Sequence, residues 1–431
     1  MSGHNLLSDL TFCVIDLETT GGNHKTDEII EIGLVKIEKL KISDKKSFLL
    51  KPSIPIPDFI QKLTGIKQKD VENCAEIQTV IEEVIEFIGD SILVAHNISF
   101  DIPFLNAVLD KMGKPFLENK VICTNVMTKH MIPEIMNSNL NYMSRLFDLG
   151  LEKAHRAQQD ATATAELILK YLEIFIKKDI RKVNQLYYPR NKFELDRHNY
   201  TNETSNQEII DSIKDCHSPL IITLKGEKGI ILGVLPIEHA PEELEIINTF
   251  LQENQWNICT LKLTGQILDG LINMNHHINK FEEKNLHIIL EHLEQRYPKP
   301  EKIKYRLNDL DFVFAPHLIQ EQIVIYPFLN LKSNTKFIFK YPSHRKKMAQ
   351  YLNSKINFFT NNLNEKRKNN ISESLYPIFE NILNSPDDHH QRIFYFLTVK
   401  KFRKNNDSML SELEQFNLSI RRKFKFPSNF L

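Results

Sequence analysis

The sequence predicts an α/β domain with a mixed sheet over residues 1–176, followed by an α+β region over residues 218–431. In the first range, short apolar runs typical of strands alternate with longer segments whose apolar residues recur at helical spacing. The composition then turns polar and loses its period over residues 177–217, which contain Pro189 and are predicted to be a linker or an elaborated connection between domains. The length of 431 residues suits two or three domains.

The elements of the first range follow from the spacing of apolar residues. Strands are expected where apolar residues run together, and helices where they recur every three or four positions. The helix that starts near Phe100 should end at Gly113, and the alanines of the last helix permit close approach of its backbone. The predicted strands are 12–15, 28–37, 47–50 and 91–95, and the predicted helices are 77–88, 100–112 and 157–174.

The second range reads as α+β and resembles no family that we can name. A turn at residues 226–229 separates two predicted strands, and the chain becomes mostly helical after residue 340. The pattern fits one domain or two. The predicted strands are 219–224, 229–235, 256–263, 310–314, 322–326 and 336–339, with a helix at 241–253.

Charge is balanced overall but unevenly distributed. The chain has 55 Lys and Arg against 55 Asp and Glu, yet residues 1–176 hold 18 basic and 25 acidic residues, which leaves 37 and 30 for the remainder. An acidic part suits cation binding and a basic part suits a polyanion. Chance variation with solvated charged faces is an equally good explanation of the asymmetry.

Several functional classes are excluded by composition. The five cysteines lie far apart without a CxxC pair, which argues against a disulfide framework and a structural zinc site. No apolar run approaches the ~20 residues needed to span a bilayer, and the first residues lack the pattern of a secretory signal. We therefore expect a cytoplasmic protein with reduced thiols and no membrane partner.

Three short segments carry side chains suited to catalysis. Asp16 and Glu18 follow the first apolar strand and should share one face, because side chains two apart on a strand point the same way. Asp101 opens a helix after the strand at 91–95. His155 and Asp160 stand at the start of the alanine-rich helix. Each segment alone has an ordinary explanation, as a solvated strand end, a helix cap or a surface histidine.

Together, the three segments predict a metal site. Open α/β sheets gather functional groups at strand ends, and four carboxylates gathered there need positive charge to offset their repulsion. Oxygen ligands without cysteine favour Mg²⁺ or Mn²⁺. Two such ions form a clamp for in-line attack at phosphorus, and a nearby histidine can take the proton of the attacking water.

The segments also resemble a known family. DLETTG, HNISFD and HRAQQDA are similar to the three motifs of the DnaQ-like 3′–5′ exonucleases of the DEDDh subgroup, which includes the proofreading ε subunit of bacterial DNA polymerase III. The resemblance covers about residues 10–175 and extends to EIIEIGLVKI, to LTGI at residues 63–66 and to LVAHN at residues 93–97. It implies a ribonuclease H-like fold and metal-dependent release of nucleoside monophosphates from a 3′ end.

The resemblance also assigns roles to residues. His155 would be the general base, and four acids would hold two Mg²⁺ or Mn²⁺ ions: Asp16, Glu18, Asp101 and Asp160. The residues expected near the terminal nucleotide are Thr19, Thr20, Gly65, Asn97 and Phe100. The chain departs from many relatives at Cys123-Thr124, where they have Asp-Thr, but that position is not a metal ligand in the family.

The leading hypothesis is a 3′–5′ exonuclease acting on single-stranded DNA 3′ ends in proofreading or repair. An exoribonuclease that trims RNA 3′ ends and a non-catalytic nucleic-acid-binding or scaffold protein remain alternatives. The second range would bind nucleic acid or a partner such as a polymerase, because basic clusters occur at residues 344–347, 366–368, 400–404 and 421–426. Residues 185–188 faintly resemble a sliding-clamp peptide, and the pairs at 276–277 and 389–390 are interpreted as surface histidines.

Overall fold

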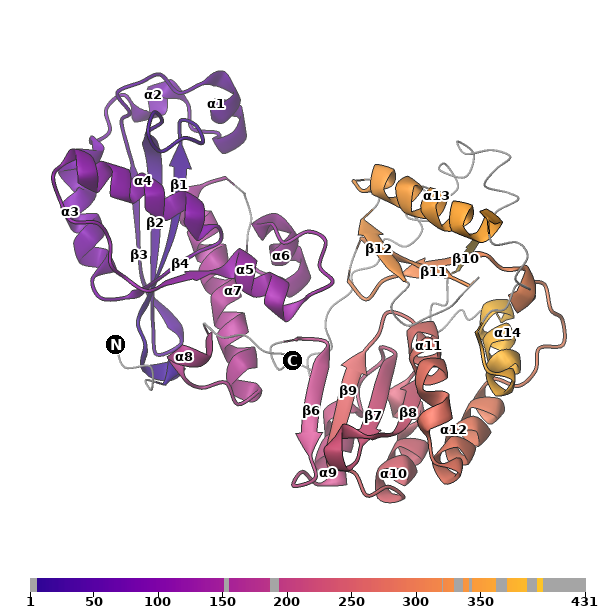
Figure 1. Ribbon diagram of the computed structural model, residues 1–431. Helices are drawn as coiled ribbons and strands as arrows, with labels where there is room; N and C mark the ends of the chain where they lie inside the picture. Colours follow the sequence, from indigo (N-terminus) through magenta and orange to yellow (C-terminus); the bar gives the residue numbers. More distant parts are fainter. Residues whose placement is uncertain are drawn as a thin grey trace. The chain divides into compact units, whose positions relative to one another are not determined.

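The computed structural model of the chain divides into two units, Met1–Glu194 and Leu195–Leu431, and each unit has its own strands and helices (Figure 1). It describes residues 6–150, 155–186, 194–319, 321–328, 336–340, 343–361, 370–385 and 394–397, with residues 356–361 and 395–397 described as backbone only.

The first unit is built on a five-stranded mixed sheet with the strand order β3-β2-β1-β4-β5. The first three strands pair antiparallel, whereas β4 runs parallel to β1 and β5 runs parallel to β4. The mixed sheet that the sequence predicts is thereby confirmed. The strands are β1 (Phe12–Thr19), β2 (Ile29–Glu38), β3 (Lys41–Leu49), β4 (Ile92–Ala95) and β5 (Val121–Cys123).

Helices cover both faces of this sheet. The apolar residues Cys13, Ile15 and Leu17 of β1 enter one core cluster with residues of α3 and α4. The opposite face is covered by α7, which packs against β1, β2 and β3 (Figure 1). The helices are α1 (Asp58–Thr64), α2 (Gln68–Val71), α3 (Ile77–Ile88), α4 (Ile98–Lys111), α5 (Thr124–Met131), α6 (Leu140–Phe147), α7 (Ala157–Lys177) and α8 (Val183–Leu186).

The close contact between α7 and the sheet depends on one glycine. A Cβ atom added to Gly33 of β2 would lie 2.2 Å from the carbonyl oxygen of Ala157 and 2.6 Å from the backbone nitrogen of Gln158. A side chain at residue 33 would therefore push the first turn of α7 off the sheet. The small residues at both positions bring the start of α7 directly against β2.

The second unit contains two four-stranded antiparallel sheets, ordered β6-β9-β7-β8 and β12-β11-β10-β13. Every predicted strand of this range has a counterpart, although β13 is an addition to a stretch expected to be helical. The strands are β6 (Arg197–Thr201), β7 (Leu220–Lys225), β8 (Ile231–Ile237), β9 (Ile258–Leu263), β10 (Phe312–Pro316), β11 (Gln322–Pro327), β12 (Phe337–Lys340) and β13 (Tyr395–Leu397).

The helices of the second unit pack on both faces of its first sheet. On β8, Gly233 faces Phe250 of α10 and Ile289 of α12, whereas Pro236 faces Gly270 of α11. No helix among the described residues is both long and apolar enough to cross a membrane. The helices are α9 (Asn206–Ile213), α10 (Leu244–Gln252), α11 (Ile267–His277), α12 (Glu283–Arg296), α13 (Arg345–Asn361) and α14 (Tyr376–Asn384).

The predicted linker at residues 177–217 is wrong over much of its length. The first unit continues to Glu194, and the second begins at Leu195. β6 pairs with β9, and α9 follows it. The polar composition that suggested a linker has a structural cause, because β6 is an edge strand whose residues are all partly or fully exposed.

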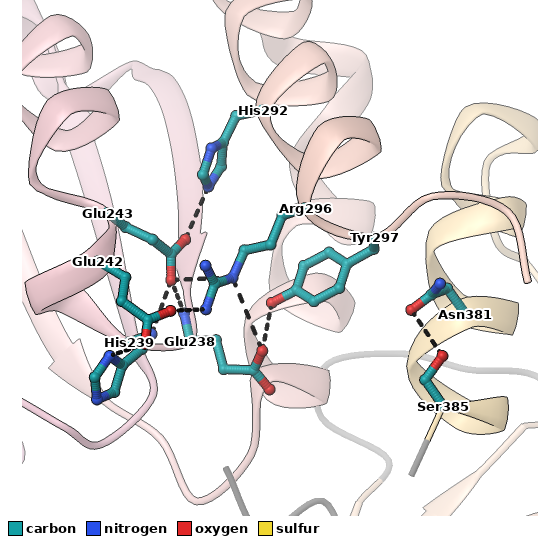
Figure 2. A network of polar contacts seen from close by, with 9 residues as sticks. All are labelled: Glu238, His239, Glu242, Glu243, His292, Arg296, Tyr297, Asn381 and Ser385. Carbon is teal, nitrogen blue, oxygen red and sulfur yellow. Dashed lines mark hydrogen bonds and ion pairs between the residues drawn. The ribbon is translucent and has the colours of Figure 1, made fainter. Parts of the chain in front are cut away.

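A buried polar network joins α12 to the end of β8 in the second unit (Figure 2). The Tyr297 hydroxyl donates to Glu238 at 2.8 Å, and His292 lies 2.8 Å from a carboxylate oxygen of Glu243. Arg296 approaches Glu243 at 3.4 Å and also contacts Glu238. Opposite charges thus lie against one another within the unit, although Nε of Arg296 makes no hydrogen bond among the described residues.

Candidate active site

β1 presents the first two acids on one face of the sheet. Side chains alternate along a strand, so Asp16 and Glu18 point the same way. This is the face covered by α7, because Asp16 pairs with Gly33 of β2, which lies against Ala157. Glu18 is only 9% exposed, and Asp16 is half-buried. The strand predicted at 12–15 extends to residue 19 and therefore contains both acids.

Asp101 approaches the same end of the sheet from the first turn of α4. β4 pairs with β1 only as far as Val14, and the strand ends at Ala95. Beyond that point the backbone of Leu17 partly offsets the rise that burial causes in the pKa of Asp101. Asp101 is 3% exposed, so the short parallel strand leaves a place for a buried acid at its end.

The third segment stands at the start of α7. His155 has a φ of 63°, in the left-handed region that residues other than glycine seldom adopt. Its backbone N–H donates to Oδ2 of Asp160 at 3.0 Å. Side-chain donor atoms of Glu18, His155 and Asp160 all lie within 4.8 Å of one another. Residues far apart in the sequence thus converge on one cluster.

Burial and mutual repulsion make ionisation of these acids unfavourable. Burial raises the pKa of Asp16 well above its ordinary value, and four neighbouring carboxylates raise it further: Asp101, Asp160, Glu18 and Glu31. Burial, followed by repulsion from other acids, raises the pKa of Glu18 to about 8. Burial also raises the pKa of Asp101 to about 7 and raises that of Asp160. Glu18 and Asp160 belong to the close group with His155, whereas Asp16 and Asp101 are linked to it by their electrostatic influence on these pKa values.

The chemistry of these side chains fits a hard cation. Oδ1 of Asp160 is buried and has no hydrogen-bond partner among the described residues. The cluster consists of carboxylates and one imidazole, without cysteine, and oxygen donors suit Mg²⁺ or Mn²⁺. Positive charge placed there would offset the repulsion that raises the carboxyl pKa values. The identity and number of the ions remain predictions.

The raised pKa values predict how stability depends on pH. The folded protein keeps protons on Glu18 and Asp101 that the unfolded chain, with ordinary carboxyl pKa values of about 4, has already lost. Their contribution to stability is therefore complete below about pH 4 and is lost as the pH rises through about 7 to 8. In urea unfolding with a chelator present, the midpoint should fall between about pH 5 and pH 8.5. Glu18→Gln should make this fall smaller, and an identical fall in that variant would contradict the assignment.

Two of the residues expected near the nucleotide make hydrogen bonds with the loop after β1. The Thr19 hydroxyl donates to the carbonyl of Gly21 at 2.5 Å. The Thr20 hydroxyl accepts from the Glu28 N–H at 2.9 Å. Both threonines are buried, and their hydrogen bonds stabilise the loop that follows the two acids.

The other three residues expected near the nucleotide are more accessible. Gly65 is exposed and ends α1 with a φ of 75°. Asn97 is exposed at the N-cap of α4 and accepts from the Ser99 hydroxyl at 3.1 Å. Phe100 is half-buried and packs against Phe104 with ring centroids 4.9 Å apart. Their contact with a nucleotide remains a prediction.

Sequence reasoning assigned no role to two charged residues beside the cluster. Glu31 pairs in register with Glu18 across β1 and β2, and it is 2% exposed. Arg156 reaches Glu31 with two hydrogen bonds, at 3.0 and 3.1 Å. A glutamate between two isoleucines in EIIEIGLVKI was the available signal, because a charged residue in a buried strand needs a partner.

The first unit matches a known family of domains. Residues 13–168 match the family model described as Exonuclease (RNase_T). This part of the chain is therefore an exonuclease domain with the ribonuclease H-like fold and a mixed sheet, as the three motifs implied.

Its relatives are much longer proteins. The PolC-type DNA polymerase III of Caldanaerobacter subterraneus subsp. tengcongensis is 39% identical over 175 residues, which cover 41% of this chain and 12% of that protein. The 3′–5′ exonuclease DinG of Staphylococcus epidermidis is 33% identical over 186 residues, which cover 43% of this chain and 21% of that protein. The match thus spans no more than about a fifth of these relatives. A solved structure of exonuclease X with 5′ overhanging duplex DNA is 27% identical, covering 37% of this chain and 89% of that one with a TM-score of 0.31.

Proposed function

We propose that the first unit is a metal-dependent 3′–5′ exonuclease that releases nucleoside monophosphates from DNA 3′ ends in proofreading or repair. The observation that carries this proposal is the convergence of Glu18, His155 and Asp160 within 4.8 Å, in the electrostatic reach of Asp16 and Asp101. A complete set of acids and the histidine argues against a non-catalytic scaffold. The direction of cleavage rests on the DinG relative, whose name specifies it.

The residues of the site have distinct proposed roles. Asp16, Glu18, Asp101 and Asp160 would hold two divalent cations, most simply Mg²⁺ or Mn²⁺. When bound, such ions stabilise negative charge on a phosphate and lower the pKa of water. His155 lies beside Glu18 and Asp160, where its imidazole can accept the proton of an attacking water. Burial of the acids limits the water that competes for the same positions.

DNA is the proposed substrate because the PolC-type relative is a DNA polymerase by name. The experiment compares DNA and RNA oligonucleotides of matched sequence, labelled at the 5′ end and incubated with Mg²⁺ or with a chelator. We expect ladders that shorten from the 3′ end, faster turnover of DNA and no product with the chelator. Faster turnover of RNA would replace the substrate assignment. Release of internal fragments would overturn the proposed exonucleolytic action.

The second unit would bind nucleic acid or a partner in trans. The basic cluster at residues 344–347 lies at the start of α13, with Arg345, Lys346 and Lys347 exposed. This arrangement suits contact with phosphates. The other three basic clusters, residues 187–188 of the clamp-like segment and the histidine pair at 389–390 lie outside the described residues.

A further inference from the structure

The cluster of acids contains an additional buried carboxylate with a partner of its own. Glu31 faces Glu18 directly across β1 and β2, an arrangement of like charges that destabilises a sheet unless it is compensated. Compensation comes from Arg156, whose guanidinium donates through two nitrogens to the two oxygens of Glu31. Such forked pairs fix the orientation of both side chains.

Glu31 also accepts a third hydrogen bond, from the backbone N–H of Ala157 at 3.0 Å. This N–H is the first of α7, and Arg156 at the N-cap makes no capping bond through its side chain. The carboxylate of β2 therefore caps α7 from outside the helix, at the end where negative charge is favourable. Three donors from two consecutive residues converge on a single carboxylate.

This attachment bears directly on the histidine and the acid of α7. His155 precedes Arg156, and its N–H is bonded to Asp160. A change in the position of Arg156 or Ala157 would thus move both His155 and Asp160 relative to Glu18. The close approach of Gly33 to Ala157 leaves no space to absorb such a shift.

We propose that Glu31 and Arg156 are positioning residues that hold His155 and Asp160 in register with the acids of β1. This inference rests on the proposed exonuclease function. Neither residue needs to touch the substrate, because both act through the start of α7. Loss of either should lower kcat, whereas KM should change little because the surface that binds the oligonucleotide stays intact.

The experiment uses the full chain with Glu31→Gln, Arg156→Gln, the double variant and Arg156→Lys. In each single glutamine variant we expect kcat at saturating Mg²⁺ to fall about ten- to a hundredfold, since a displacement of about 1 Å costs that much. KM should stay within about twofold, and the double variant should lose no more than the worse single variant. Arg156→Lys, which keeps the charge but not the fork, should be intermediate.

A second readout does not depend on catalysis. Amide hydrogen exchange in the metal-free protein should accelerate over residues 155–161 in both single glutamine variants. The matched control is Glu83→Gln, which removes a surface ion pair with Lys46 in the same unit and should change neither readout. If Glu31→Gln does not fold, the two Arg156 variants carry the test, because that side chain is 37% exposed.

Three results would overturn the inference. They are an unchanged kcat in folded single variants, a loss in only one of the two, and a double variant whose loss is the product of the single losses. An inactive wild-type protein would instead refute the proposed function, and hydrogen exchange would still decide whether the pair fixes the start of α7.

Discussion

Replacing Asp16 with alanine is expected to lower the rate of oligonucleotide degradation by about a thousandfold or more. The carboxylate lies among the other acids of the cluster, and its loss removes a proposed cation ligand. Cations at a transferring phosphate contribute several kcal/mol, and each ~1.4 kcal/mol is a factor of ten in rate. Initial rates on a labelled single-stranded DNA in Mg²⁺ measure the effect.

The matched control for this substitution is Asp44→Ala on β3. Asp44 is also an acid on a strand of the same sheet, but it is exposed and bonds only the neighbouring Lys45 N–H in the described structure. The Asp44→Ala variant should degrade DNA at the wild-type rate. Circular dichroism should show that the Asp16→Ala variant is folded. The substitution removes a carboxyl group whose ionisation is unfavourable in the folded protein. Full activity in Asp16→Ala would end the nuclease proposal.

Gly33→Ala is expected to cost both stability and activity. Its added methyl group would lie 2.2 Å from the Ala157 carbonyl oxygen, which is backbone that cannot rotate away. Overpacking of this kind costs about 1–3 kcal/mol in the free energy of unfolding. Because the strain falls on the start of α7, the rate of DNA degradation should drop about a hundredfold as well. Urea unfolding and initial rates on the same preparations measure the two effects.

Gly22→Ala makes the corresponding control. A Cβ atom on Gly22 would meet nothing within 4 Å, so the free energy of unfolding should change by no more than about 0.5 kcal/mol. Equal stability of Gly33→Ala and wild type would show that α7 can shift without cost. The close approach of α7 to β2 would then have no bearing on the site.

Strongly periodic or apolar segments could be predicted from the sequence. The helix expected at 77–88 is α3 with the same limits, because its apolar residues recur at helical spacing over three turns. The strand at 28–37 corresponds to β2, shifted by one residue. Short helices such as α2 contain too few turns to show a period. β6 was mistaken for linker because an edge strand needs no apolar run.

The candidate site was predictable in its residue types and only partly in its arrangement. Alternation along a strand placed Asp16 and Glu18 on one face, as the structure has them. The left-handed backbone at His155 was not predicted, because residues other than glycine seldom adopt it. The cap by Glu31 was not predictable, because it joins residues that are 126 positions apart. Pairing of β1 with β2 fixes which glutamate faces Glu18, and a sequence alone does not supply that register.

The raised carboxyl pKa values mean that the site works against the folding of its own domain. At neutral pH, burial and mutual repulsion of these acids lower the free energy of unfolding. The core formed by α3, α4 and the sheet offsets this cost. A chain selected for robustness alone would replace these acids with neutral residues. A domain that carries these acids therefore gives up stability for the chemistry proposed for them.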